Sequence, residues 1–188
     1  YKKMLLEQEL AADSFGKGYA YTILRPAFIF GPYNYAPRES WYIRRIVRGE
    51  PLYEPSDARG QFQMVYVKDV GEAICLCIGS RSAENQRYNL SAPDILDYSK
   101  YMELLEGVSD KKFQTVNITV NEVLRQRIPL PFPLTEEESE LFDGSKIVRD
   151  LGFAYSDLKE SMKLTFHAFR GVYEQKQTTP GRKEEKQE

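Results

Sequence analysis

Few residues in this chain are of types that do chemistry, and their number already excludes several kinds of site. The 188 residues include one histidine, His167, and two cysteines, Cys75 and Cys77. A Ser–His–Asp triad would have one possible base, and a histidine-rich metal site is excluded. His167 falls in a late amphipathic segment, which favours a packing or surface role. Cys75 and Cys77 stand at i and i+2 of an apolar helical run and point in different directions, so neither a disulfide nor a metal site is expected.

A lysine and a glutamate at helical spacing stand near the start of the chain. Residues 1–16 predict a helix that ends at two glycines, with Lys3 and Glu7 one turn apart. On spacing alone, this pair indicates an exposed ion pair worth roughly 0.3 kcal/mol. Four arginines are candidates for binding an anionic group, but a solvated helix face is favoured for the first three: Arg44, Arg45, Arg48 and Arg59.

The stretch TILRPAFIFGP, residues 22–32, is the element most able to position such groups. Its first residues suit a buried strand over 19–25, and Pro26 removes a backbone donor, so a loop is expected over 26–37. In an α/β sheet, ligands bind beyond the carboxyl ends of the strands. This loop is therefore our candidate for the floor of a ligand site.

Composition places the chain among folded proteins that are not strongly charged. It has 41% hydrophobic residues, 13% aromatic residues and a net charge of −2, which gives no support for general binding to nucleic acid or acidic membranes. The sequence contains no membrane-spanning run and no signal peptide, so the cytoplasm is the default expectation.

Strands alternate with helices, which predicts an α/β fold with a parallel sheet. Residues 50–60 are interpreted as a surface excursion, Asp69 as the cap of the next helix, and 173–188 as a polar, disordered tail.

Five separated segments together resemble a known family: KMLLEQEL (3–10), TILRPAFIFGP, QMVYVKDVGEAI (63–74), YNLSA (88–92) and FDGSKIVRDLGF (142–153). In order and spacing they are similar to the carboxyl-terminal half of the extended or atypical short-chain dehydrogenase/reductases, the NAD-dependent epimerase/dehydratases. The resemblance implies the second half of a Rossmann-type parallel sheet plus a smaller α/β carboxyl-terminal substrate domain. Residues 1–90, with a substrate-side excursion over 33–60, would form the first part and residues 91–172 the second.

The resemblance also implies roles for particular residues. Lys3 matches the catalytic lysine of the YxxxK motif, whose tyrosine would lie upstream of residue 1; Tyr1 is not that tyrosine. An ammonium group beside a phenol favours the phenolate, which suits general acid–base catalysis. Pro26, Ala27 and Phe28 match the wall that faces the nicotinamide of NAD or NADP, with free backbone groups of Ala27 and Phe28 able to address its carboxamide.

The chain also departs from the family pattern. Phe28 replaces an asparagine that many nucleotide-sugar enzymes carry, Phe62 stands near their diphosphate-binding arginine, and Lys68 replaces an acidic residue. Phe28 and Arg59 are then the candidate substrate contacts, with Arg59 the basic residue nearest the missing arginine. No GxGxxG or P-loop appears in the sequence, so a phosphate-binding loop would have to lie in an absent amino-terminal part.

Two functions are compatible with these features. The first is part of an NAD(P)-dependent epimerase, dehydratase or reductase that acts on a small molecule such as a nucleotide sugar, with a homodimer built on the helix of residues 1–16. The second is a catalytically silent member that binds RNA or a protein, with Trp41, Tyr33 and Tyr35 beside the arginine-rich helix of 38–48. Net acidity speaks against the second function.

Overall fold

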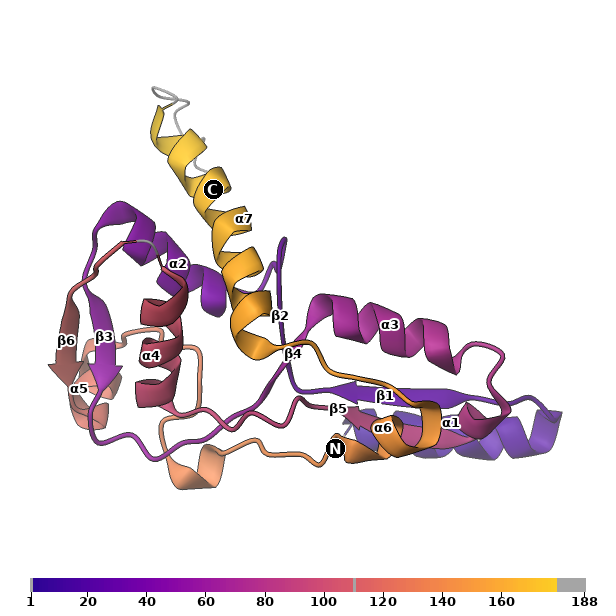
Figure 1. The fold of residues 1–188 in the computed structure, drawn as a ribbon. Coiled ribbons are helices and arrows are strands. Elements are labelled where there is room, and N and C mark those ends of the chain that lie inside the picture. The colour runs from indigo at the N-terminus through magenta and orange to yellow at the C-terminus, as the bar shows by residue number, and fades with distance from the viewer. Residues whose placement is uncertain (1, 110, 179–188) are drawn as a thin grey trace, which may run out of the picture.

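The computed structural model describes residues 2–109 and 111–178, and the chain forms two lobes joined through its centre (Figure 1). Seven α-helices and six short strands are described within these ranges. In chain order they are α1 (Lys2–Lys17), β1 (Thr22–Pro26), β2 (Phe28–Phe30), α2 (Glu39–Arg48), β3 (Leu52–Pro55), β4 (Met64–Tyr66), α3 (Val67–Cys77), β5 (Gln86–Leu90), α4 (Tyr98–Val108), β6 (Thr115–Ile118), α5 (Val120–Gln126), α6 (Ser145–Leu151) and α7 (Leu158–Thr178).

The strands form three parallel pairs, as the alternation of strands and helices predicts. β1 pairs with β5, β2 with β4 and β3 with β6. Each pair joins strands that are far apart in sequence, with at least one helix between them. This pattern is typical of right-handed βαβ crossovers, and it confirms the predicted mixed α/β class with parallel strands.

The first lobe is built on β1 and β5, with helices on both faces. α1 lies on one face, where the Glu7 carboxylate reaches Arg25 of β1. On the other face, Ala73 of α3 and Ile147 of α6 pack with Tyr88 and other residues of β4 and β5 in one buried cluster. α3 lies above the strands and α1 below them in Figure 1. The strands are therefore covered by helices, as parallel sheets require.

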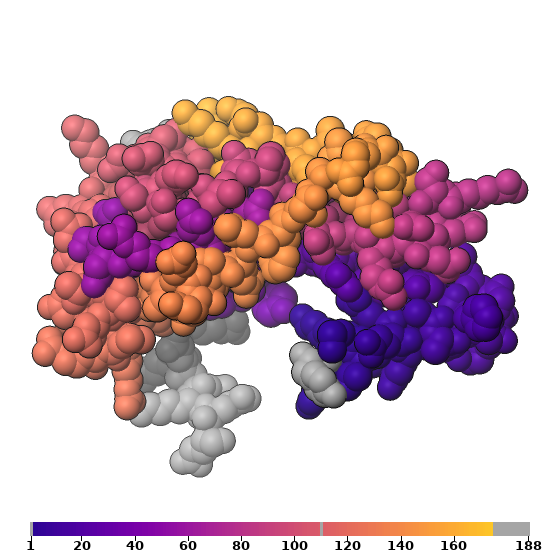
Figure 2. Space-filling view, turned by 90° about the horizontal axis from the view of Figure 1, so that it is seen from below, coloured from indigo at the N-terminus to yellow at the C-terminus, as the bar shows by residue number. Residues whose placement is uncertain are grey.

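The second lobe is built on β3 and β6, covered by α2, α4 and α7. Its core is rich in aromatic side chains, and the ring of Phe132 stacks on that of Phe62 with centroids 4.0 Å apart. The inward face predicted for α7 is confirmed, since Met162 and Phe166 are fully buried. In the space-filling view, residues of the two lobes gather at opposite ends, with the orange segment near residue 150 running between them (Figure 2).

β4 connects the two cores because successive residues of a strand point to opposite faces. Met64 and Tyr66 belong to the aromatic core of the second lobe, whereas Val65 belongs to the core of the first. β2 lies beside β4, and Gly31 follows it at once. A Cβ atom on Gly31 would lie 2.4 Å from a methyl carbon of Val67, so glycine is favoured where the chain leaves β2 beside α3.

Three local predictions were wrong, each because tertiary contacts decided the local structure. Residues 26–37 are not all loop, because Phe28–Phe30 form β2 against β4. Residues 50–60 are not only a surface excursion, because β3 pairs with β6 and Leu52 is fully buried. Asp69 does not cap α3, whose first turn it occupies; its carboxylate accepts hydrogen bonds from the backbone and side chain of Ser156.

The carboxyl-terminal helix runs further than predicted. α7 continues to Thr178, so the first residues of the expected polar tail are helical. The rest of that tail, 179–188, lies outside the described residues, as does Tyr1. Within the described parts of the chain, none of the helices is both long enough and apolar enough to cross a membrane.

Candidate functional site

Lys3 lies in the first turn of α1, the helix that precedes the predicted ligand site. A four-residue link joins α1 to β1, and the helix runs antiparallel to the strand, so its first turn is directed towards the side on which β1 ends (Figure 1). The Glu7 carboxylate contacts Arg25. Lys3 is one turn earlier, about 6 Å along the helix axis. The turn of α1 that carries Lys3 therefore extends beyond the Glu7–Arg25 contact, in the direction in which β1 ends at Pro26.

Glu7 is engaged by the sheet and not by Lys3. Its carboxylate accepts two hydrogen bonds from the Arg25 guanidinium, one of them at 2.8 Å, and lies 3.7 Å from Nε of Arg87. The hydrogen bond from Arg25 is the main reason that the pKa of the Glu7 carboxyl lies below its usual value. The simple helical ion pair suggested by spacing is therefore wrong. The Lys3 side chain is exposed, and among the described residues no carboxylate forms an ion pair with it.

The backbone after β1 is less free than the sequence suggested. The Ala27 amide donates a 2.9 Å hydrogen bond to the Leu90 carbonyl of β5, so it is not available to a ligand. That part of the prediction is wrong, because the ladder between β1 and β5 continues one residue beyond Pro26. Pro26 has no amide hydrogen and ends the strand, so the chain turns away from the sheet at this point.

Phe28 packs into the second lobe and is covered by an arginine. Its ring makes edge contacts with Phe62 at 6.0 Å and Phe132 at 5.8 Å between centroids. The guanidinium carbon of Arg38 lies 4.9 Å from the Phe28 ring centroid, a cation–π contact. The Phe28 side chain is thus half-buried against the second lobe, and the Arg38 guanidinium covers one face of its ring.

A hydrogen-bonded loop connects this wall to α2. The carboxylate of Glu39, which is fully buried, accepts 3.1 Å hydrogen bonds from the Gly31 amide and from Nδ2 of Asn34. Asn34 also donates to the Ile29 carbonyl and accepts from the Ala36 amide. Burial raises the pKa of the Glu39 carboxyl, and the hydrogen bond from Asn34 is the largest effect that opposes it.

The same loop displays two tyrosines to solvent. Tyr33 is 91% exposed and Tyr35 98% exposed, on either side of the inward-pointing Asn34. Tyr33 has φ of 66°, a left-handed conformation that costs a bulky residue free energy. The loop is therefore held in a shape that presents both rings outward.

Arg59 lies apart from Phe28, in a different hollow. This cavity of about 370 Å³ is lined by Arg59 together with Glu54 and Asp97 and contains no Phe28. Burial is the main cause that raises the pKa of the Glu54 carboxyl, and nearby carboxylates add to it. The two predicted substrate contacts are thus not brought together, and the surroundings of Arg59 are acidic.

Two of the other arginine candidates have structural partners. Arg45 and Arg48 form ion pairs with Glu50, and Arg45 also lies over the ring of Trp41, which is buried. Of the aromatic residues considered for nucleic-acid stacking, only the two loop tyrosines remain accessible.

The remaining chemistry-bearing side chains form no further site among the described residues. Cys75 and Cys77 are free thiols, and the Cys75 side chain is exposed. His167 packs edge-on against Phe166 in α7. Among the residues that the structure describes, no cluster of histidine, cysteine and carboxylate side chains is suited to a metal ion.

Solved structures of epimerases share the fold of this chain. The chain superimposes on the UDP-glucose 4-epimerase of Thermotoga maritima solved with UDP-glucose, with a TM-score of 0.67 and 24% identity over 88% of this chain and 51% of that one. The Thermus thermophilus UDP-glucose 4-epimerase, solved with NAD, gives a TM-score of 0.68 and 22% identity over 88% and 51% of the two chains. An epimerase from Methanothermobacter thermautotrophicus gives 0.71 and 15% over 94% and 51%. The chain therefore shares the fold of about half of each of these epimerase structures.

The sequence comparison bears on the first lobe. Residues 1–91 match the model of the NAD dependent epimerase/dehydratase family, which confirms the predicted resemblance. Over 86 residues the chain is 35% identical to the chloroplast stem-loop binding protein of 41 kDa b from Arabidopsis thaliana, covering 46% of this chain and 22% of that protein. The chain thus spans about half or less of the length of the relatives that it matches.

Sequence analysis did not identify three residues that shape the site. Arg38, at the start of the expected helix of 38–48, was not singled out, and neither was the buried pair of Asn34 and Glu39. Asn34 and Glu39 are five residues apart with Pro37 between them, a spacing that matches no recognisable pattern. Their roles depend on β2, which places the Ile29 carbonyl and the Gly31 amide beside them.

Proposed function

We propose that this chain supplies the acid–base lysine and the nicotinamide-facing wall of an NAD(P)-dependent epimerase, dehydratase or reductase that acts on a nucleotide sugar. The observation that carries this proposal is the exposed Lys3 side chain in the first turn of α1, which has no carboxylate ion-pair partner among the described residues. The family match over residues 1–91 and the fold support the same function. The catalytic tyrosine and the phosphate-binding loop would come from polypeptide outside residues 1–188.

The residues present fit the nicotinamide end of a dinucleotide and not its phosphates. Glu7 is held by two arginines and leaves Lys3 free to donate hydrogen bonds to ligand hydroxyls. The ammonium group would also favour the phenolate form of a nearby tyrosine and so assist proton transfer. When bound, the nicotinamide would accept and return a hydride. Pro26, Ala27 and Phe28 would form the wall that limits its position and excludes water.

Two earlier expectations enter this proposal in altered form. Phe28 serves as a packed wall beside Arg38, and its ring is not free to stack on a ligand. Arg59 is not part of the proposed site, because it lies in a hollow with Glu54 and Asp97. A homodimer formed through α1 remains a proposal that rests on the family alone.

The decisive experiment is a titration of NAD⁺ and NADP⁺ into the protein expressed from its complete gene. Lys3→Met keeps helix propensity and side-chain length but removes the charge. We expect it to weaken dinucleotide binding about tenfold, the loss of one charge-assisted hydrogen bond. Lys2→Met, an exposed neighbour, is the matched control and should change affinity less than about twofold. Equal affinity of Lys3→Met and the wild type would refute the role of Lys3.

Binding of RNA without catalysis is the second candidate function. It is favoured by the exposed Tyr33 and Tyr35, since bases stack on such rings, and by the similarity to a protein named for stem-loop binding. The same titration with an RNA stem-loop discriminates the two. Binding of RNA with no binding of either dinucleotide, lost when both tyrosines are changed to alanine, would establish the second function and exclude the first.

A further inference from the structure

Arg38 stands at a position where an arginine side chain does not support the local structure. It is the N-cap residue of α2, and its side chain makes no capping hydrogen bond. The residues that cap helices well are serine, threonine, aspartate and asparagine. The positive amino end of a helix also repels a cation. Local rules of this kind are broken mainly at functional sites, which indicates a role for the Arg38 side chain outside the helix.

The Arg38 guanidinium is held in place without a hydrogen-bond partner. Its carbon lies 4.9 Å from the centroid of the Phe28 ring, and the residue is half-buried. The backbone is fixed on both sides, because the Arg38 amide donates to the Ala36 carbonyl at 2.8 Å and the Arg38 carbonyl accepts from the Trp41 amide at 3.1 Å. Among residues 2–109 and 111–178, the Arg38 side chain forms no ion pair and no hydrogen bond. The N–H donors of a preorganised cation are therefore without a partner in this part of the chain.

The carboxylate that follows Arg38 in sequence is already engaged. The Glu39 carboxylate accepts hydrogen bonds from the Gly31 amide and from Nδ2 of Asn34. Burial is the main effect on the pKa of Glu39 and raises it, and the charge of Arg38 makes the smallest contribution that opposes this rise. Glu39 therefore does not neutralise the Arg38 guanidinium by an ion pair.

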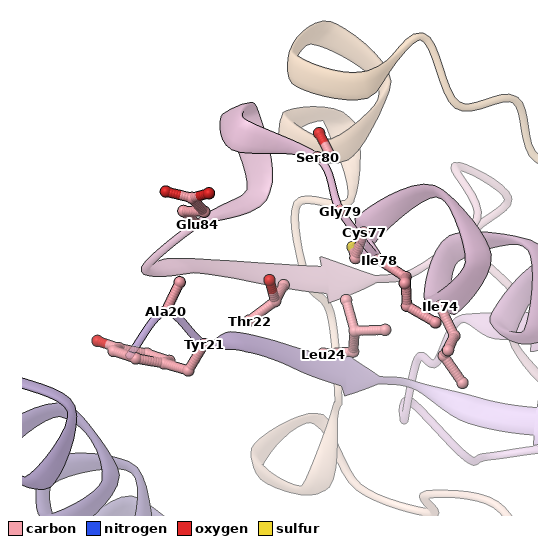
Figure 3. A pocket seen from close by; sticks show the side chains of 10 residues that line it. All are labelled: Ala20, Tyr21, Thr22, Leu24, Ile74, Cys77, Ile78, Gly79, Ser80 and Glu84. Carbon is pink, nitrogen blue, oxygen red and sulfur yellow. The ribbon is translucent and has the colours of Figure 1, made fainter. Parts of the chain in front are cut away.

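Two hollows of the described chain are poorly suited to an anion. The hollow of about 490 Å³ between β1 and α3 is lined mainly by apolar side chains such as Leu24, and its charged lining residue is Glu84 (Figure 3). The hollow that contains Arg59 also contains Glu54 and Asp97. A negatively charged ligand would meet a carboxylate in either hollow, whereas the Arg38 guanidinium lies against an aromatic ring.

We propose that Arg38 binds an oxyanion of the substrate, a phosphate or a carboxylate group, and so selects substrates that carry such a group. This inference rests on the proposed function, because it names the residue that binds the charged part of that substrate. A guanidinium can donate two parallel hydrogen bonds to two oxygens of either group. The Phe28 ring excludes water from one face of the guanidinium, which strengthens these bonds. Arg38 thereby orients the substrate beside the wall that contains Phe28.

NMR of arginine side chains in the protein expressed from its complete gene tests direct contact. Inorganic pyrophosphate and D-glucuronate are the anionic probes, and D-glucose is the neutral control. We expect at least one anion to shift the Arg38 Nε–H resonance in a saturable manner, and glucose to leave it unchanged. A shift with pyrophosphate alone would identify a phosphate as the bound group, and a shift with glucuronate alone a carboxylate. If neither anion shifts the resonance, or glucose shifts it equally, the proposal is wrong.

Two variants separate anion binding from packing. Arg38→Met keeps an apolar stem over Phe28 but removes the charge, and Arg38→Lys keeps the charge without the planar fork. We expect Arg38→Met to weaken binding of the anion about tenfold or more and Arg38→Lys about threefold. Arg81→Met, which changes an exposed arginine of the first lobe, is the matched control and should alter the affinity less than about twofold. A lower Tm of Arg38→Met with unchanged anion affinity would leave Arg38 a packing role only and would overturn the proposal.

The outcome for Arg38 is distinguishable from the test of the proposed function. Dinucleotide binding by the wild type, together with no effect of Arg38 on either anion, would refute the role of Arg38 alone. Absence of dinucleotide binding by the wild type would refute the proposed enzyme, whatever the anions show. Binding of an RNA stem-loop that Arg38→Met weakens, with no shift by either small anion, would assign Arg38 to RNA and would also overturn the proposal.

Discussion

Replacing Asn34 by alanine should destabilise the loop that carries Arg38 and the two exposed tyrosines. The Asn34 side chain donates to the Ile29 carbonyl and to the Glu39 carboxylate and accepts from the Ala36 amide, with each contact at 3.1 Å. Each bond contributes about 1 kcal/mol net. Asn34→Ala should therefore lower the free energy of unfolding by about 2–3 kcal/mol. In a chain of this size, that corresponds to a fall in Tm of about 5–10 °C.

The effect of Asn34→Ala should grow as pH rises. Burial raises the folded-state pKa of Glu39 above its ordinary value of 4.5, and the Asn34 amide partly offsets this rise. A carboxyl with a raised folded-state pKa contributes stability below the unfolded pKa and loses it as pH increases through the folded pKa. Without Asn34 the folded pKa of Glu39 rises further, so the loss extends over a wider range. The destabilisation should be larger at pH 7 than at pH 4.5.

Urea denaturation followed by circular dichroism at both pH values measures these changes. Asn89→Ala is the control, because its amide makes one contact, a 3.5 Å approach to the Asp143 carbonyl on the surface. That variant should alter the free energy of unfolding by less than about 0.5 kcal/mol. A change below this value for Asn34→Ala, or an effect that shrinks towards pH 7, would refute the assigned role of the buried Glu39 carboxylate.

Two further predictions concern the packing around the site. Glu7→Gln should lower stability by about 0.5–1 kcal/mol at pH 7, because the Glu7 side chain is 19% exposed and its arginine partners are partly solvated. Since the pKa of Glu7 is lowered in the folded state, its contribution is lost as pH falls through that pKa, and urea curves at pH 3 should show a smaller difference; an equal difference at both pH values would contradict the ion-pair assignment. Gly60→Ala should lower Tm, because the added Cβ would lie 2.3 Å from the Pro133 carbonyl oxygen and cost about 1–3 kcal/mol. Gly71→Ala, with no atom within 4 Å of the new methyl in α3, should raise Tm slightly in the same calorimetric scans, and an equal fall in both would remove the steric explanation.

The sequence predicted the regular elements where one face of a segment carried the signal. The strand ending at Pro26 and the inward face of α7 were both read from local pattern and are confirmed. β2 was missed because its three residues, Phe28–Phe30, are too few to show a period, and only pairing with β4 makes them a strand. β3 was missed because the two prolines and several charged residues of 50–60 are typical of a surface loop. Burial of Leu52 in the second lobe stabilises the strand.

The candidate site shows the same division between local pattern and long-range contacts. The spacing predicted that Lys3 and Glu7 lie on one side of a helix. In the structure the Glu7 carboxylate pairs with Arg25 and Arg87 instead. A guanidinium group loses less side-chain entropy for each hydrogen bond than a lysine does, which favours the arginines. Likewise, the amide of Ala27 appeared free until the ladder to Leu90 was seen. Hydrogen bonds between segments that are distant in sequence cannot be predicted from local sequence pattern.

Local sequence pattern predicts the α/β class and the break at Pro26, because side-chain period and the absent amide hydrogen of proline are local properties. The resemblance of the first lobe to the epimerase/dehydratase family is likewise carried by the residues themselves. Long-range contacts in the folded chain establish that Glu7 pairs with Arg25 and that Arg38 covers Phe28. The physical reason is that ion pairs, packing and strand edges depend on which distant segments meet, and this is set by the burial of both cores together.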